Sequence, residues 1–449
     1  MTSRDLDTHD SSISPPRPPL MVCEHCAALH REVELQPGET AACGRCGAVL
    51  QRFSRLTPHD WFALALAALV VFLIANAFPV ASVAVQGQVR SATLADAVIM
   101  AWQTGHPLVA ILCGLAAIVL PGLQILLLLV ILGYLCLRRT SVDLIPGLRL
   151  LGWIQPWSMV PVFVLAVLVA LVKLAGLASV ELQPGMAGFA VLTVLITMLG
   201  RLTPRALWRF AERERLVAMY RPPAQPGRAL VACHACGQVQ PLAGNGTGRC
   251  LRCEAALHWR KPDWLARSWA LLLTAAILYL PANLLPIMVI DSPLLGNSRH
   301  TILGGVIELA RLGSWDLAII VFIASFVVPL GKMLALVCLL LATQWRWQGS
   351  LAARTQLYRV VEFVGQWSML DVFVVLLLTA LAHFSGLMTI EAGVAAGAFG
   401  MVVVLTMLSA IAFDPRAGWD HARPPSVSES SPSSAASCRD RTRSPTTKH

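Results

Sequence analysis

The chain has 449 residues, of which 56% are apolar and only 13% are charged, and its formal net charge is +10. Soluble globular domains usually carry about 25% charged residues, so this composition excludes an ordinary soluble protein. The arginines and lysines lie mainly between alternate apolar segments, as the positive-inside rule requires of membrane proteins. Membrane topology therefore explains the positive charge, and we expect no nucleic-acid partner.

Residues 1–20 are polar and rich in proline, without the apolar core of a signal peptide, and we expect a disordered tail. Residues 21–52 follow and contain two Cys-x-x-Cys pairs with 16 residues between them. The four cysteines are Cys23, Cys26, Cys43 and Cys46. Two residues between cysteines let both thiolates face one ion, and two such pairs supply the tetrahedral sulfur shell that suits zinc. This pattern predicts a small zinc ribbon.

Other chemistries also use cysteines at this spacing. Disulfides are disfavoured in a reducing cytoplasm, and a redox Cys-x-x-Cys normally belongs to a much larger domain. A ribbon of about 30 residues is too small to fold without a cross-link, which favours a structural metal. Zinc is the expected ion, and iron in the same sulfur shell stays open as an alternative.

Residues 57–210 form the first predicted membrane unit. Its uncharged stretches run over residues 61–88, 107–137, 153–172 and 182–200. About 20 apolar residues cover a hydrocarbon core of about 30 Å, and unbroken apolar runs span it as helices. We expect four transmembrane helices here, followed by a basic cytoplasmic linker over residues 211–229.

The second half of the chain repeats this order. A second ribbon over residues 230–261 is expected to bind zinc through Cys233, Cys236, Cys250 and Cys253. Residues 264–413 are expected to form a second unit of four helices, and residues 414–449, rich in serine, proline and arginine, a disordered tail. Each half would thus be one ribbon followed by one helix bundle.

Matching motifs support an internal duplication at an offset of about 207 to 211 residues. Asn76-Ala-Phe-Pro79 matches Asn283-Leu-Leu-Pro286, and Trp157-Ser-Met159 matches Trp367-Ser-Met369. The prolines are interpreted as helix terminators, with a kink that lines a cavity as the alternative. The predicted fold is an all-α polytopic membrane protein with two tandem four-helix units, eight spans in total. Both termini and both ribbons would be cytoplasmic.

Few ionisable residues interrupt the predicted spans, and they differ between the halves. Lys332 and Asp371 fall in the second unit, where the first unit has Gln124 and Pro161. A charge at mid-membrane costs at least about 2.5–3.5 kcal/mol and is usually paired, placed in a cavity or used. We expect Lys332 and Asp371 to pair across a polar cavity of the second unit, with the first unit mainly supporting it. A structural ion pair without a transport role is the alternative.

Other candidate transport residues accompany this pair. They are Glu362, His383, Lys173 and Ser368. Asp371, Glu362 and His383 are candidates for carrying protons, while Lys332 or Lys173 could meet a lipid phosphate as a point charge. Lys173 lies near a predicted span end, where a lysine can also reach the interface without a functional role.

The duplicated ribbon-and-helix pattern, with Trp367-Ser-Met369 followed by Asp371-Val-Phe373, resembles the paraquat-inducible protein A family over about residues 20–418. The resemblance implies an inner-membrane protein of Gram-negative bacteria. It also implies a periplasmic partner that carries mammalian-cell-entry domains, and movement of phospholipid between the inner membrane and the tunnel that this partner forms. Pro161 departs from the pattern, which favours the second half for any proton-linked function.

No ATP-binding or catalytic motif is present, so we expect a transport component driven by the proton-motive force or a lipid gradient, and not an enzyme. Two alternatives stay open. The chain could be a membrane anchor whose ribbons dock a cytoplasmic partner, or a redox protein that uses the Cys-x-x-Cys pairs. A lipid-sized cavity would favour transport over the anchor, and bound zinc would exclude the redox protein.

Overall fold

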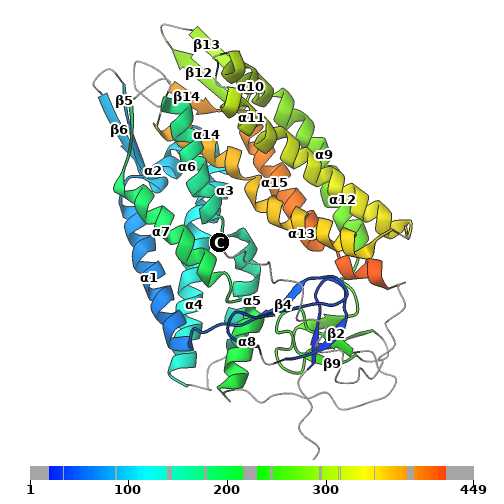
Figure 1. Ribbon diagram of the computed structural model, residues 1–449. Coiled ribbons are helices and arrows are strands. Elements are labelled where there is room, and N and C mark those ends of the chain that lie inside the picture. The colour runs from blue at the N-terminus through cyan, green and yellow to red at the C-terminus, as the bar shows by residue number, and fades with distance from the viewer. Residues whose placement is uncertain are drawn as a thin grey trace, which may run out of the picture.

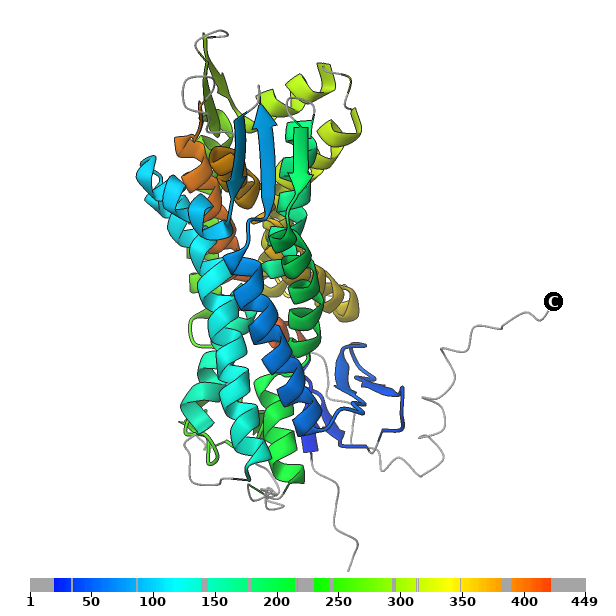
Figure 2. The same ribbon diagram turned by 90° about the vertical axis from the view of Figure 1, so that its left-hand side faces the viewer.

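The computed structural model describes residues 20–33, 35–85, 88–138, 144–175, 179–214, 216, 230–242, 246–292, 296–311, 313, 315–347, 349–381 and 389–420. The helices stand side by side in an elongated bundle (Figures 1 and 2). Small antiparallel sheets lie at one end of the bundle, called here the sheet end, and the cysteine ribbons lie at the other, called the ribbon end. Residues 1–19 of the expected N-terminal tail and residues 421–449 of the expected C-terminal tail fall outside the described residues. Disorder from residue 414 onward was wrongly expected, because Pro415–Trp419 form a 3-10 turn and the side chains of Asp414 and Trp419 are buried.

Ribbon 1 consists of two hairpins, in which β1 (Leu20–Val22) pairs with β2 (Leu29–Arg31) and β3 (Thr40–Ala42) with β4 (Val49–Arg52). The rest of the first half contains α1 (Pro58–Ala77), β5 (Ala81–Val85), β6 (Gln88–Ala92), α2 (Leu94–Gln103), α3 (Pro107–Gly114), the π-helical turn η1 (Leu115–Val119), α4 (Leu120–Cys136), α5 (Leu144–Ile154), the 3-10 turn η2 (Gln155–Trp157), α6 (Val160–Ala175), β7 (Ser179–Leu182), α7 (Pro184–Leu199) and α8 (Pro204–Arg213).

Ribbon 2 has the same two hairpins, β8 (Leu230–Ala232) with β9 (Val239–Pro241) and β10 (Thr247–Arg249) with β11 (Ala256–His258). The rest of the second half contains α9 (Trp264–Leu284), β12 (Met288–Ser292), β13 (Gly296–His300), α10 (Ile302–Arg311), α11 (Trp315–Phe322), the π-helical turn η3 (Ile323–Val327), α12 (Val328–Gln344), α13 (Leu351–Trp367), α14 (Leu370–Leu381), β14 (Thr389–Ala392), α15 (Val394–Ala412) and the 3-10 turn η4 (Pro415–Trp419).

Six helical segments among the described residues are long and apolar enough to span a membrane. They are Pro58–Ala77, Pro107–Cys136, Leu144–Leu171, Trp264–Leu284, Ile323–Gln344 and Val394–Ala412. α7 and α8 would form a seventh as one broken span, bent by 59°. These segments fit a multi-pass membrane protein. The seventh of the eight expected spans falls on α14, which has 12 described residues. The residues that follow it, 382–388, are outside the described part of the chain.

Each Asn-x-x-Pro motif ends a helix and meets a glycine from the last long helix of its half. α1 and α9 end two residues before Pro79 and Pro286, which confirms the prolines as terminators. A Cβ on Gly185 would lie 2.4 Å from the carbonyl oxygen of Phe78, and one on Gly393 would lie 2.0 Å from that of Pro286. Only glycine allows these approaches, so both positions fix how the last helix joins the sheet end.

The sheets at the sheet end share one topology. Their strand orders are β6-β5-β7 and β13-β12-β14, all antiparallel. In each, a hairpin that follows the first long helix of a half pairs with a strand that precedes its last long helix. The sheets therefore tie the beginning and the end of each half together.

The halves meet at the sheet end through α14. This helix packs on α2, α3 and α6 of the first half. The rings of Phe163 in α6 and Phe373 in α14 meet edge to face, with their centroids 5.6 Å apart. The largest apolar core accordingly joins the first-half helices with α14 and one face of α15. This contact is direct apolar packing between the halves.

Candidate functional site

A cavity of about 410 Å³ lies between the two halves. α4, the segment from η2 to α6, and α7 line it from the first half, and α12, α13 and α15 line it from the second. The polar and aromatic side chains among the lining residues include Gln124, Ser158, Thr197, Lys332, Tyr358 and Glu362. Residues of both halves thus form the walls, whereas the sequence analysis expected a cavity within the second unit.

Lys332 is the most unusual of these residues, because only 3% of it is exposed. Its Nζ is fully buried and has no hydrogen-bond partner among the residues that the structure describes. A Cβ on Gly365 would lie 3.1 Å from this Nζ, so the absence of a side chain at this position of α13 makes room for the ammonium group. A buried polar group without a partner is costly, and in a native protein it indicates a bound ligand, water or ion.

Gln124 occupies the corresponding place in the first half. Each of the two residues follows a π-helical turn, η1 before Gln124 and η3 before Lys332. Such turns add a residue to a helix and occur frequently at functional sites. The Oε1 of Gln124 and the Oγ of Ser158 are also buried without a hydrogen-bond partner in the described part of the chain. The cavity therefore presents one cation, the carboxyl group of Glu362 and several neutral polar groups that can bind a ligand.

Only some of the predicted transport residues line this cavity. Lys332 and Glu362 both line the cavity, and Glu362 is exposed. Ser368 is buried at the turn between α13 and α14, and its Oγ likewise has no partner among the described residues. Asp371 lies in the first turn of α14, but its side chain lies outside the described structure, as does that of Lys173 in α6.

His383 also falls outside the described residues. The pairing of Lys332 with Asp371 therefore stays a prediction. The contribution of the first half to the cavity wall was not predicted, although Gln124 and Ser158 stand at the positions that correspond to Lys332 and Ser368. What it lacked was any signal that both positions face the boundary between the halves.

The two cysteine sets converge as predicted. The Sγ atoms of each set lie within 4.8 Å of one another, and Cys46 is the only one of the eight that is not buried. The closest Sγ pairs are 3.5 to 3.6 Å apart. A disulfide needs about 2.05 Å, whereas a tetrahedron with metal–sulfur bonds of about 2.3 Å places its sulfurs about 3.8 Å apart. The residues fit a closed four-thiolate metal site.

The backbone around each cysteine pair also fits such a site. The residue after the second cysteine of every pair has a positive φ: 56° at Ala27, 70° at Gly47, 75° at Gly237 and 55° at Glu254. This left-handed residue closes the tight turn, and its amide donates to the carbonyl of the first cysteine. In ribbon 1, Nε2 of His30 lies 3.2 Å from the Sγ of Cys43, in position to donate to a thiolate. A closed sulfur shell makes a structural site and leaves no open position for catalysis.

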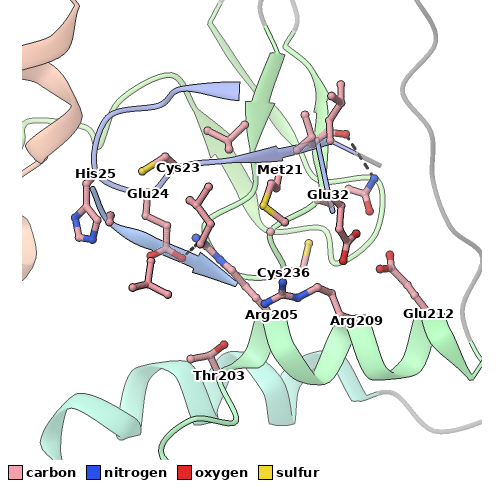
Figure 3. Close-up of a pocket in the computed structure, with 18 of the residues that line it drawn as sticks. Met21, Cys23, Glu24, His25, Glu32, Thr203, Arg205, Arg209, Glu212 and Cys236 are labelled. Carbon is pink, nitrogen blue, oxygen red and sulfur yellow. Dashed lines mark hydrogen bonds and ion pairs between the residues drawn. The ribbon is translucent and has the colours of Figure 1, made fainter. Parts of the chain in front are cut away.

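The ribbons and α8 enclose a second cavity, of about 310 Å³ (Figure 3). Acidic and basic side chains line it in balance. Arg205 pairs with Glu24, Arg252 pairs with Glu212, and Arg209 is attracted by the nearby carboxylate of Glu32. Because these opposite charges are paired, the described residues of the cavity offer no unpaired positive charge to an anion. We interpret it as the interface at which the two ribbons pack on α8.

Comparison with known proteins adds to this geometry. The family model described as paraquat-inducible protein A matches residues 59–212 and 265–423. The intermembrane transport protein PqiA of Escherichia coli is 33% identical over 406 residues, which cover 89% of this chain and 95% of the relative. The lipophilic envelope-spanning tunnel protein A of Escherichia coli is 30% identical, covering 90% and 92%. A probable intermembrane transport protein of Haemophilus influenzae is 30% identical, covering 89% and 95%. No solved structure matches the chain.

Proposed function

Because this chain belongs to the paraquat-inducible protein A family, we propose that it is an inner-membrane component of a phospholipid transport system. Its relatives are named as transport proteins and not as enzymes, which agrees with a transport component. In this proposal the chain receives a lipid headgroup in the cavity between its halves. It then exchanges the lipid with a periplasmic protein that carries mammalian-cell-entry domains.

The buried ammonium of Lys332, which has no hydrogen-bond partner among the described residues, carries this proposal. A phospholipid phosphate is an anion whose oxygens accept hydrogen bonds, and a lysine meets it as a point charge with three donors. Gln124 and Ser158 offer further hydrogen bonds to the phosphate or to its substituent. The volume of about 410 Å³ lies in the range of about 300–1,000 Å³ that is typical of small-molecule sites. It suits a headgroup whose acyl chains remain in the bilayer.

The proposed topology has eight spans in two tandem units, residues 57–210 and 264–413, with both termini and both ribbons in the cytoplasm. Arginines gather at the ribbon end, which supports this orientation. They include Arg52, Arg55, Arg138, Arg149, Arg209 and Arg346. The sheet end would then face the periplasm and the tunnel partner. In a reducing cytoplasm the eight cysteines would hold two structural zinc ions.

The proton-coupled form of the proposal assigns the proton to a carboxyl or imidazole near the lipid site. Glu362 lines the cavity and is the first candidate, and Asp371 and His383 are the others from the sequence. Vesicles with and without an imposed pH gradient decide this point. Equal transfer in both would remove proton coupling and leave the lipid site intact.

The direct test is transfer of a fluorescent phospholipid from vesicles that contain the full chain to the tunnel partner. Lys332→Gln, which installs the residue of the corresponding first-half position, should reduce transfer at least about tenfold, because a charge-assisted hydrogen bond is lost. Lys332→Arg should retain part of the transfer, and Arg267→Gln, on an exposed site of α9 near the ribbon end, should retain all of it. Wild-type transfer by Lys332→Gln would overturn the lipid site and favour a membrane anchor that only holds the tunnel.

A further inference from the structure

We infer that the two ribbons are exchanged between the halves, and that the metal of ribbon 1 holds the halves together at the ribbon end. Ribbon 1 precedes the first-half helices in the chain, yet it packs on the second half. Cys23, Cys26, Cys43 and Ala48 share an apolar cluster with Trp419 of η4, against which Leu351 of α13 also packs. The guanidinium of Arg45 stacks over the ring of Trp419, 4.5 Å from its centroid.

Ribbon 2 shows the converse arrangement. It precedes α9, but its buried residues belong to the same apolar core as Leu207 and Trp208 of α8. Arg252 of this ribbon pairs with Glu212 and lies over the ring of Trp208, 5.1 Å from the ring centroid. Arg149 of α5 donates a hydrogen bond to the carbonyl oxygen of Cys253. The core of each ribbon thus packs on the half to which it does not belong in sequence. The last residues of ribbon 2 also contact their own half, where Arg260 pairs with Asp420 and Lys261 donates to the carbonyl oxygen of Phe413.

The first metal-binding turn, from Cys23 to Cys26, touches both halves through the two residues between its cysteines. Glu24 pairs with Arg205 of α8 in the first half, as Figure 3 shows. The ring of His25 meets that of Tyr358 in the second half, with centroids 6.2 Å apart and planes at 63°. Arg205 also donates to the carbonyl oxygen of His234, 3.3 Å away, at the matching position of the second ribbon. One guanidinium therefore binds the corresponding turns of both ribbons.

These contacts depend on a folded ribbon, and a ribbon of this size folds only with its metal. At the sheet end, by contrast, α14 joins the halves by apolar packing that needs no metal. Loss of metal should therefore loosen the ribbon end and leave the sheet end closed. Tyr358 lines the cavity between the halves, so ribbon 1 also positions one cavity wall. Only this last consequence rests on the proposed function.

Hydrogen–deuterium exchange of the full chain in detergent micelles tests the exchange of ribbons. Replacing two ligands in ribbon 1, Cys43→Ser with Cys46→Ser, should speed amide exchange about tenfold or more in the first turns of α13 and in η4. The matched change in ribbon 2, Cys250→Ser with Cys253→Ser, should instead affect α5 and α8. α14 should keep its protection in both. If each variant disturbs only the half that follows its own ribbon, the inference is wrong.

A second variant guards against a ribbon that simply unfolds. His25→Ala with Arg45→Ala keeps all four cysteines, so its zinc content should equal that of the wild type. It should nevertheless speed exchange in α13 and η4 several-fold, because the contacts of His25 with Tyr358 and of Arg45 with Trp419 are removed. Arg31→Ala, on an exposed site of ribbon 1, is the matched control and should change neither. Unchanged exchange in α13 and η4 with zinc retained would overturn the coupling. None of these measurements involves lipid, so their failure is distinct from failure of the transport proposal.

Discussion

Replacement of Lys332 by methionine should make the protein more stable and less able to bind lipid. Methionine has a similar length and no charge, so the variant removes the ammonium and keeps most of the packing around Gly365. The buried charge costs about 2.5–3.5 kcal/mol in a membrane helix. Because no described residue compensates Nζ by a hydrogen bond, we expect the free energy of unfolding to rise by about 1–3 kcal/mol.

Lipid binding should move in the opposite direction. Hydrogen bonds to charged groups contribute about 1.5–3 kcal/mol, so losing the ammonium should weaken phosphate binding by about 10- to 150-fold. The first assay is denaturant unfolding of both proteins in one detergent. The second is quantitative mass spectrometry of the phospholipid that purifies with each. A site built for a ligand predicts this opposition between stability and binding.

The alternative of a structural ion pair makes the opposite prediction for stability. If Lys332 only balances the charge of Asp371, its removal leaves a buried carboxylate unpaired. Breaking such a pair typically destabilises a protein by about 3–5 kcal/mol. A methionine variant that is destabilised to this extent, with its bound lipid unchanged, would refute the ligand site.

Three further predictions concern the close contacts, the metal sites and the ribbon-end acid. Gly393→Ala should destabilise the fold by about 1–3 kcal/mol, because its new Cβ would lie 2.0 Å from a backbone oxygen. The control Gly331→Ala has open space around the new Cβ and should not destabilise the fold. Equal unfolding midpoints of the two variants would contradict this prediction. Elemental analysis should find two zinc ions per chain, and chelation should lower the thermal midpoint; iron in their place would correct the metal assignment. Burial by itself would raise the pKa of Asp414, but Arg416 holds this pKa below its usual value. The carboxylate therefore stabilises the fold above about pH 3.9, and this contribution is lost as the pH falls through the folded-state pKa. Asp414→Asn should flatten the stability curve between about pH 5 and 2, and an unchanged curve would exclude this role.

Local features of the sequence predicted the local features of the structure. The cysteine spacing identified both four-thiolate sites, because a metal-binding turn is set by a few neighbouring residues. Apolar stretches located the long helices, and the prolines at positions 79 and 286 marked where α1 and α9 end. The family expected from the Trp-Ser-Met motifs is confirmed by the match over both halves. These signals lie within single elements, where periodicity and spacing act.

Contacts between distant elements were not predictable in this way. The sequence placed Lys332 inside one unit, whereas Gln124 and Ser158 of the other unit line the same cavity. Nor did it indicate that each ribbon packs on the opposite half, since packing partners leave no periodic trace. Gly393 and Gly185 are not equivalent in the duplication, because Gly393 caps α15 at the position where Gln183 caps α7, so the motifs gave no sign of their close approaches to backbone.

The central claim is that a phospholipid headgroup occupies the cavity between the halves. A photoreactive amino acid at Val361, which lines the cavity, can be compared with one at Val360, which is 51% exposed on the same helix. After illumination in cells, mass spectrometry identifies any phospholipid joined to each position. We predict a phospholipid adduct at position 361 that Lys332→Gln reduces about tenfold, while any adduct at position 360 does not change. No adduct at position 361, or one that Lys332→Gln leaves unchanged, would contradict the account.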